Sequence, residues 1–241
     1  MNDACGWKVI DLESVGSTND YLKERLQGLH DRTVVTARRQ TAGRGRLGRT
    51  WASPPGGLYA SLLLKPPPVP ELAQRVSLLA AGILCGIMGE AGMDACIKWP
   101  NDVLVDDRKI AGILPEFGTK PEPWFILGAG VNLVSAPPVP DGRGLPSTAW
   151  SEYARPPAPG ELLASFLSCL DAAWPDRSVD PLAGGTESIS RRLWRFGRTV
   201  HISRGSDAVT GVVTGIDAAG RLVLRSDSGT TVLDSGEIGM I

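Results

Sequence analysis

The chain has 241 residues, 42% of them hydrophobic, so it can bury a full core in one large domain or in one large and one small domain. Its 25 basic and 26 acidic residues exclude a field over the whole surface that would attract nucleic acid or an anionic membrane. The start, MNDACGWKVI, does not read as a secretory signal, and the longest nearly apolar run, 76–89, is too short to span a bilayer. We therefore expect a cytoplasmic protein that binds no membrane.

The four cysteines are far apart in the sequence and include no C-x-x-C pair: Cys5, Cys85, Cys96 and Cys169. With only two histidines in the chain, this pattern argues against a zinc site and against a disulfide framework. We expect reduced thiols, packed mostly in the core.

Strands and helices are predicted in mixed order along the chain. Ser17 to Asp20 resembles an N-cap that opens a helix, and a longer helix is expected on the apolar stripe Leu72, Val76, Leu79, Ile83 and Ile87. A further helix is expected at 161–174, and strands at 7–12, 33–37, 58–65, 95–105, 110–117 and 124–131. Because no regular alternation of strand and helix appears, the prediction is an α+β structure.

The turn at 106–109 joins two of these strands. If Val105 pairs with Ile110, one face of the hairpin carries Asp102, Leu104, Lys109, Ala111 and Ile113. A loop rich in proline and glycine follows at 135–146.

The sequence changes character near residue 195. From there the chain reads as short strands separated by glycine-containing turns, which is typical of a small β-barrel. We predict two domains, 1–194 and 195–241.

The stretch QTAGRGRLGRTW, residues 40–51, contains Gly43, Gly45 and Gly48 at the spacing of a dinucleotide-binding loop. Such a loop must open a helix, but SPPGG follows at 53–57, which a helix interior does not tolerate. Five arginines and no acid lie between residues 38 and 49. Glycine backbone and forked guanidinium donors favour a small anion; the alternative is a solvated basic loop.

The second informative stretch is KWPNDVLVDDRKIAGIL, residues 98–114. Lys98, Asn101, Asp102 and Lys109 are polar groups among apolar strands, which is consistent with a wall for a ligand that has one charged and one apolar end. Asp102 could hold Mg²⁺ together with substrate phosphates. The alternative is a surface ion pair, with Lys109 as a turn lysine beside Asp106.

These two stretches, with STN at 17–19, SPPGGLY at 53–59 and GAGVN at 128–132, resemble the biotin protein ligase family in sequence and in order. The resemblance covers nearly the whole chain and is to the short, monofunctional form, without a preceding DNA-binding winged helix. It implies a catalytic domain with a mixed sheet and helices, like that of class II aminoacyl-tRNA synthetases, followed by an SH3-like β-barrel.

The family's reaction, implied here by the resemblance, joins biotin to ATP as biotinyl-5′-AMP with loss of pyrophosphate. Biotin is then transferred to a lysine of the biotin carboxyl carrier domain of acetyl-CoA carboxylase or a related carboxylase. Mg²⁺ is the implied cofactor. We expect no specific DNA binding, and a homodimer is left open.

Matching the family's motifs residue by residue implies three sets of site residues. Those for biotin are Ser17, Thr18, Asn19, Gln40, Gly43, Arg44, Gly45, Arg46, Trp51, Lys109, Gly112 and Ile113, the last two with Trp51 along the apolar tail. Those for ATP are Arg46, Arg49, Lys98, Asn101, Asp102 and Asn132, with Asp102 as the metal ligand. Lys109, Arg44 and Arg46 are the implied catalytic residues, because two anions that repel must be drawn together.

Two alternatives are weighed against this interpretation. A lipoate-type ligase would run the same adenylation on a different acid, but the arginine loop and KWPND favour biotin. A nucleic-acid-binding module belongs to a different class, and the balanced charge argues against it.

Overall fold

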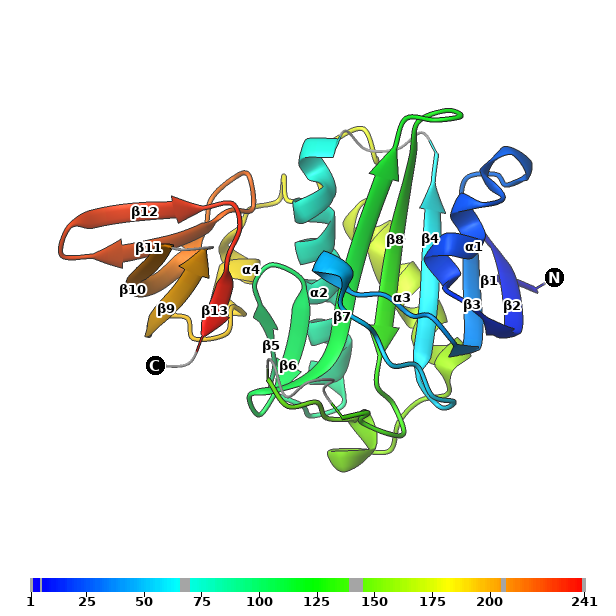
Figure 1. Ribbon diagram of the computed structural model, residues 1–241, viewed down its shortest axis with the longest axis horizontal. Coiled ribbons are helices and arrows are strands. Elements are labelled where there is room, and N and C mark those ends of the chain that lie inside the picture. Colours follow the sequence, from blue (N-terminus) through cyan, green and yellow to red (C-terminus); the bar gives the residue numbers. More distant parts are fainter. Residues whose placement is uncertain (1, 5, 66–69, 139–144, 205–206, 240–241) are drawn as a thin grey trace.

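The structure is a computed structural model that describes residues 2–4, 6–65, 70–138, 145–204 and 207–239. Its larger sheet has eight strands in the order β1-β2-β3-β4-β8-β7-β6-β5 (Figure 1). Only β2 and β3 run parallel among these neighbours, so the sheet is mixed, as predicted. The strands are β1 (Asn2–Ala4), β2 (Trp7–Val15), β3 (Thr33–Gln40), β4 (Leu58–Leu64), β5 (Ala95–Lys98), β6 (Asp102–Val105), β7 (Arg108–Gly118) and β8 (Trp124–Val131).

Helices cover both faces of this sheet. Figure 1 shows α2 (Ala73–Glu90) and α3 (Pro159–Ala173) behind the sheet, and α1 (Thr18–Lys23) in front of it. Successive side chains of β4 therefore enter different cores: Leu62 packs on the side of α2 and α3, and Leu63 packs on the side of α1. Because both faces are covered, β4 is buried along its whole length.

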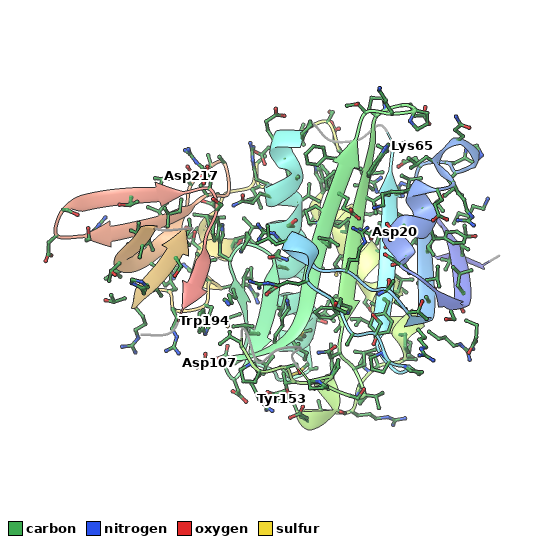
Figure 2. All side chains as sticks on the ribbon, in the orientation of Figure 1. Asp20, Lys65, Asp107, Tyr153, Trp194 and Asp217 are labelled. Carbon is green, nitrogen blue, oxygen red and sulfur yellow. The ribbon has the colours of Figure 1, made fainter. Side chains whose placement is uncertain are left out.

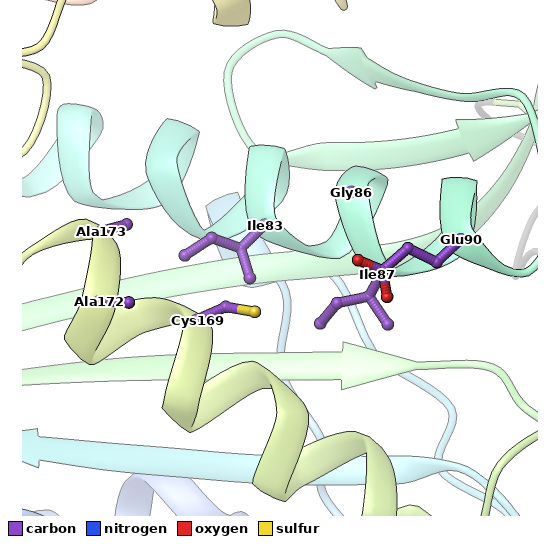
Figure 3. Close-up of a pocket in the computed structure, with 7 residues that line it drawn as sticks. All are labelled: Ile83, Gly86, Ile87, Glu90, Cys169, Ala172 and Ala173. Carbon is purple, nitrogen blue, oxygen red and sulfur yellow. The ribbon is translucent and has the colours of Figure 1, made fainter.

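The apolar stripe predicted for the long helix is only partly its buried face. Leu79, Ile83 and Ile87 are half-buried, whereas the fully buried positions include Ala80 and Leu84. The reason is that α2 packs against the sheet on one side and against its neighbour α3 on another, so it is apolar on two sides, which a helical period alone does not distinguish. Figure 3 shows the half-buried isoleucines in an apolar groove between α2 and α3, on the face opposite α1.

The same helical segment is longer than its apolar run suggested. From Pro70 to Glu90 it has 21 residues, and an 18-residue window within it has a mean hydropathy of 1.6, so by length and composition alone it could cross a bilayer. However, 56% of that window is buried inside the protein, against the sheet and α3. We interpret it as the core helix of this fold.

The predicted strand 95–105 is two strands. β5 and β6 form a hairpin around Pro100, whose ring nitrogen has no hydrogen to donate to a sheet. The predicted pairing of β6 with β7 is also wrong: Val105 pairs with Arg108, and a β-bulge beside Val103 shifts the register.

The bulge changes which side chains share a face. Asp102 pairs with Gly112 across the two strands, and Val103 pairs with Ala111. Ala111 and Ile113 consequently turn away from Asp102 and Lys109 into the core shared with α2 and α3.

The C-terminal segment forms a separate five-stranded antiparallel sheet in the order β12-β11-β10-β9-β13, which confirms the predicted small all-β unit. The described pairings do not join β12 to β13, so for these residues it is an open sheet rather than a closed barrel. Its strands are β9 (Thr199–Arg204), β10 (Asp207–Ile216), β11 (Leu222–Ser226), β12 (Gly229–Leu233) and β13 (Glu237–Gly239), preceded by the short helix α4 (Glu187–Arg191).

The change from one sheet to the other falls within a few residues. Leu193 bridges to Ile97 of β5, and Phe196 bridges to Val213 of β10. The proposed division into 1–194 and 195–241 is compatible with these bridges and stays a prediction.

The cysteines are less buried than expected. Cys85 is buried, but Cys96 is half-buried and Cys169 is exposed on α3; these three, which the structure describes, are free thiols. Cys5 lies outside the described residues. Burial raises the pKa of both Cys85 and Cys96 to about 12.

Candidate active site

The polar end of the site is the start of α1. Ser17 caps the helix, and its hydroxyl accepts a hydrogen bond from the backbone N–H of Asp20 at 3.5 Å. Thr18 and Asn19 are each 4% exposed. The buried Ser61 Oγ on β4 lies 2.7 Å from Thr18 Oγ1 and 2.5 Å from Asn19 Oδ1. These side chains form one cluster of hydroxyl and amide groups.

Gln40, at the end of β3, joins this cluster to the arginine loop. Its Oε1 accepts from the backbone N–H of Thr18 at 2.9 Å, and its Nε2 donates to Ser53 Oγ at 2.9 Å. At Gly43 a Cβ atom would lie 2.4 Å from the Trp51 carbonyl oxygen and 2.8 Å from Ser53 Oγ. Glycine is therefore required there by the close approach of the two sides of the loop.

Backbone hydrogen bonds close the arginine loop on itself. Gly45 N–H donates to the Arg49 carbonyl at 2.7 Å, and Trp51 N–H donates to the Gly43 carbonyl at 2.9 Å. At the tip, a single 3₁₀ turn (Arg46–Gly48), Leu47 is 88% exposed and has a φ of 55°. The segment opens no α-helix, so it is not a dinucleotide-binding fingerprint.

The arginines of this loop point to different partners. Arg46 donates to Asn101 Oδ1 at 3.1 Å and so reaches the KWPND turn. Burial lowers the pKa of Arg46, although the charge of Asp102 opposes the effect, and the guanidinium remains charged. Arg44 instead pairs with Asp20 on α1 and with Glu116 on β7.

Glycines on β7 and β8 form the apolar middle of the site. Gly112 and Gly130 pair across the two strands, and a Cβ at Gly130 would lie 2.6 Å from the Trp51 indole. A Cβ at Gly128 would lie 2.6 Å from Asn19 Oδ1. The indole and the polar end can contact the sheet here only because these positions have no side chains.

The charged end lies on β5, β6 and β7. Lys109 Nζ is 2.7 Å from Asp102 Oδ1 and 5.2 Å from the centre of the Trp51 ring. Lys98 is the backbone partner of Asp102 across β5 and β6, and its Nζ lies 5.8 Å from the centre of the Trp194 ring. The alternative in which Lys109 pairs with Asp106 is wrong.

Asn132, at the end of β8, is 2% exposed. Its Nδ2 donates to the Thr148 carbonyl at 3.0 Å, and Thr148 N–H donates to the Lys109 carbonyl at 2.9 Å. The segment 146–150 therefore ties Asn132 to Lys109. Asn132 Oδ1 is buried, and no hydrogen-bond donor reaches it among the described residues.

The structure thus brings most of the predicted residues together along one face of the sheet, but not Ile113. The Ile113 side chain lies in the core on the other face, because Gly112 occupies the site side of β7; Leu114, two residues further on, shares the face of Gly112. Sequence reasoning missed Ser61 and Glu116. A single serine inside the apolar run LYASLLL was the one available signal for Ser61.

The oxygen ligands of the site are too few to hold a metal ion by themselves, so a metal would also need ligands from a bound phosphate. Among the residues that the structure describes, no group of three His, Cys, Asp or Glu side chains could hold an ion. Asp102 offers one carboxylate, already paired with Lys109, while Asn101 Oδ1 accepts from Arg46. One carboxylate fits Mg²⁺ that keeps most of its coordination from phosphate and water.

Comparison with known proteins agrees with this geometry. The sequence model of the "Biotin/lipoate A/B protein ligase family" matches residues 12–120, and that of the "Biotin protein ligase C terminal domain" matches residues 196–240. The biotin protein ligase from Aquifex aeolicus, solved in complex with biotin and ATP, is similar with a TM-score of 0.78 and 28% identity, over 96% of this chain and 97% of that one.

Two curated relatives are similar over nearly their whole length. The biotin–[acetyl-CoA-carboxylase] ligase of Paracoccus denitrificans is 34% identical over 94% of this chain and 98% of that protein. The ligase of the same name from Mycobacterium tuberculosis is 31% identical over 97% of this chain and 89% of that protein. With the fold, the gathered site and these relatives in agreement, the chain belongs to the biotin protein ligase family.

Proposed function

We propose that this biotin protein ligase activates biotin with ATP to biotinyl-5′-AMP and then transfers biotin to one lysine of a biotin carboxyl carrier domain, as in acetyl-CoA carboxylase. One observation carries the proposal. A polar cluster, a glycine floor under Trp51 and a cationic end follow one another along a single face of the sheet. This order matches a ligand with a flat polar head, an apolar tail and a terminal carboxylate.

In this proposal the ureido ring of biotin binds at the start of α1. Its two N–H groups and one carbonyl are matched by the hydroxyls of Ser17 and Thr18 and by the amides of Asn19 and Gln40. Because Thr18, Asn19 and Ser61 are buried, their polar groups are held in fixed positions before the ligand arrives. The valeryl tail then passes over Gly112 and Gly130 beside Trp51.

The carboxylate of biotin attacks the α-phosphorus of ATP, and the bond from that phosphorus to the bridging oxygen of pyrophosphate breaks. Lys109 and Arg46 lie where the two anions meet, and their charges reduce the repulsion between them. Asp102 holds the Lys109 ammonium by an ion pair, so the cation is oriented before the substrates bind.

The nucleotide is placed toward Asn132. Its Oδ1 is a buried acceptor that suits an amino group such as that of adenine. Arg49 and Lys98 are the further cations assigned to phosphates. Mg²⁺ would be held by Asp102 and by the phosphates, where it would neutralise phosphate charge.

In the second step the amine of the carrier lysine attacks the acyl carbon of the mixed anhydride, and AMP leaves. This step needs no further cofactor, because the anhydride is already activated. A homodimer and a cytoplasmic location stay predictions for this protein.

A lipoate-type ligase is the nearer alternative, because the matching family model includes both activities. The polar cluster at the start of α1 favours biotin, since the dithiolane head of lipoate has no hydrogen-bonding groups to match it. No observation in the structure favours a nucleic-acid-binding module.

The experiment that tests the function mixes the purified chain with ATP, labelled biotin and a biotin carboxyl carrier domain. The expected result is label on one lysine of the carrier, dependent on ATP and on Mg²⁺. Parallel reactions with lipoate in place of biotin decide between the two acids. Labelling by lipoate alone would overturn the proposal.

A further inference from the structure

Two carboxylates outside the predicted site hold the first arginine of the loop. Arg44 donates to Asp20 from Nε at 3.2 Å and from one terminal nitrogen at 2.7 Å. The same terminal nitrogen lies 3.0 Å and 3.2 Å from the two oxygens of Glu116. Lys23 Nζ completes the group, at 2.7 Å from Asp20 and 3.1 Å from Glu116. Figure 2 shows Asp20 on α1, in front of the sheet.

We call these four side chains, Asp20, Lys23, Arg44 and Glu116, the loop clamp. Two negative and two positive charges are balanced in it, and they come from α1, from the arginine loop and from β7. An isolated pair on the surface contributes little to stability. Here the pairs share partners, and the Glu116 side chain is only 21% exposed, so the network orders three separate segments at once.

The loop clamp is continuous with the polar end of the site. Glu116 Oε2 accepts a hydrogen bond from Asn19 Nδ2 at 2.6 Å, and the other end of that amide, Oδ1, lies 2.5 Å from Ser61 Oγ. Glu116 therefore fixes which way the Asn19 amide is turned. Without the Glu116 carboxylate, the buried Asn19 Nδ2 would lose its 2.6 Å hydrogen bond.

The clamp also sets the position of the whole loop. The loop is closed by the bonds from Gly45 to Arg49 and from Trp51 to Gly43. It is joined to the fold at its base by Gln40 and Ser53, at Asn101 by Arg46, and at α1 and β7 by Arg44. If Arg44 is released, the loop loses its ties to α1 and β7, so Arg46 and the Trp51 indole are held less firmly over the sheet.

We propose that Asp20 and Glu116 are positioning residues for adenylation: through Arg44 they hold the arginine loop in place, and through Asn19 Glu116 orients the biotin end. The inference rests on the proposed function. In this proposal the Arg44 side chain anchors the loop to α1 and β7, in addition to any contact that the Arg44 backbone makes with the ligand.

The test compares Asp20→Asn and Glu116→Gln with a matched control, Glu24→Gln. Glu24 also pairs with an arginine on this side of the protein, Arg25 at 2.9 Å, but is not bonded to the loop. In biotin-dependent exchange of pyrophosphate into ATP, each clamp variant should raise the KM for biotin about tenfold and change kcat by less than about threefold. The control should match the wild type.

A second measurement needs no activity. Substrate-free protein is digested briefly with trypsin, and cleavage after Arg44, Arg46 and Arg49 is followed by mass spectrometry. Both clamp variants should be cut several-fold faster in the loop than the wild type and the Glu24→Gln control.

A double-mutant cycle identifies Arg44 as the link. Once Arg44→Gln is present, adding Asp20→Asn should cause little further increase in the KM for biotin or in the rate of tryptic cleavage after Arg46 and Arg49. Fully additive effects, or unchanged cleavage and unchanged KM in both single variants, would overturn the proposal. If the wild type fails to adenylate biotin, the proposed function fails, while the cleavage arm still decides whether the clamp holds the loop.

Discussion

Lys109 is held between an acid and an aromatic face. Its ion pair with Asp102 and the Trp51 ring beside it leave the ammonium few orientations, all on the site side of β7. If the cation acts on charge that develops in the transition state, Lys109→Gln should slow adenylate formation by about a hundredfold, or ~3 kcal/mol, while biotin affinity falls less. Pyrophosphate exchange measured beside calorimetric biotin binding separates the two effects.

The neighbouring Arg108 provides the control for this variant. It lies on the same hairpin but pairs with Glu152 and Tyr153, away from the site. Arg108→Gln should leave exchange close to that of the wild type. Near-normal exchange in Lys109→Gln would show that the lysine is not catalytic.

The glycine floor gives a second prediction at the residue scale. In Gly130→Ala the new methyl group would lie 2.6 Å from the Trp51 indole, so the indole must move off the sheet. Biotin affinity should fall by about tenfold or more, because the tail and the indole share this space. Gly86→Ala on α2, where a Cβ meets nothing within 4 Å, is the control. Unchanged calorimetric affinity in Gly130→Ala would place the tail elsewhere.

The charge state of Asp20 gives a prediction on pH. Burial raises the pKa of Asp20, but the hydrogen bond and charge of Lys23, with the charge of Arg44, outweigh it and hold the pKa below 3.8. A pKa lower in the folded state means that the ionised carboxylate adds stability above 3.8 and that this gain is lost as the pH falls through the folded pKa. The Tm difference between the wild type and Asp20→Asn should be present at about pH 6 and shrink at about pH 3. A difference independent of pH would contradict this.

Sequence reasoning took the candidate site residues from short motifs, and the structure brings most of these residues together. It could not find Glu116, because the ion pairs of this side chain join three segments that are distant along the chain. It misplaced the Ile113 side chain because one β-bulge reverses the faces of a strand, and nothing in KIAGIL marks the extra residue.

At the scale of elements, the arginine loop is weakly packed at its tip. Leu47 is almost fully exposed, and glycines and like charges follow one another along the loop. We predict that the tip of the loop, beyond the part held through Arg44, moves when the site is empty and is ordered over the adenylate, where it would also keep water from the anhydride. Tryptic cleavage at Arg46 and Arg49 should slow several-fold when biotin and ATP are added together. Equal rates with and without ligands would count against this.

Whether a segment forms a helix or a strand was easier to predict than which other segments it packs or pairs with. The buried run of β4 and the Ser17 cap of α1 are local signals, and both were interpreted correctly. The apolar stripe of α3 was also recognised, although the helix begins at Pro159, two residues before the predicted start. The proline in KWPND is a local sign of the break between β5 and β6, although one strand was predicted there. The short strand β1 and helix α4 depend on tertiary contacts that no local pattern records.

At the scale of the whole molecule, the C-terminal unit contacts the segments that carry the candidate site residues. Figure 2 places Trp194, just before the small unit, near Asp107 in the turn between β6 and β7, and its Nε1 donates to that carboxylate at 2.5 Å. On the other side, the Gly220 carbonyl accepts from Trp99 Nε1 of KWPND at 3.0 Å and from Gln74 on α2. Through the Trp99 hydrogen bond, the C-terminal unit therefore contacts the segment that carries Asn101 and Asp102.

This docking leads to a prediction for Gly220→Ala. Gly220 has a φ of +76°, and a Cβ there would lie 3.1 Å from Leu78 and 3.2 Å from Arg75, so alanine is strained and also pushes the turn away from α2. Gly92→Ala is a matched control, because its φ of +82° carries a similar strain while a Cβ meets nothing within 4 Å. Both variants should lose roughly 1–2 kcal/mol of stability, a Tm lower by about 2–8 °C. Only Gly220→Ala should also raise the KM for ATP, since only it disturbs the Trp99 contact. Equal KM values in the two variants would show that the small sheet does not position the catalytic turn.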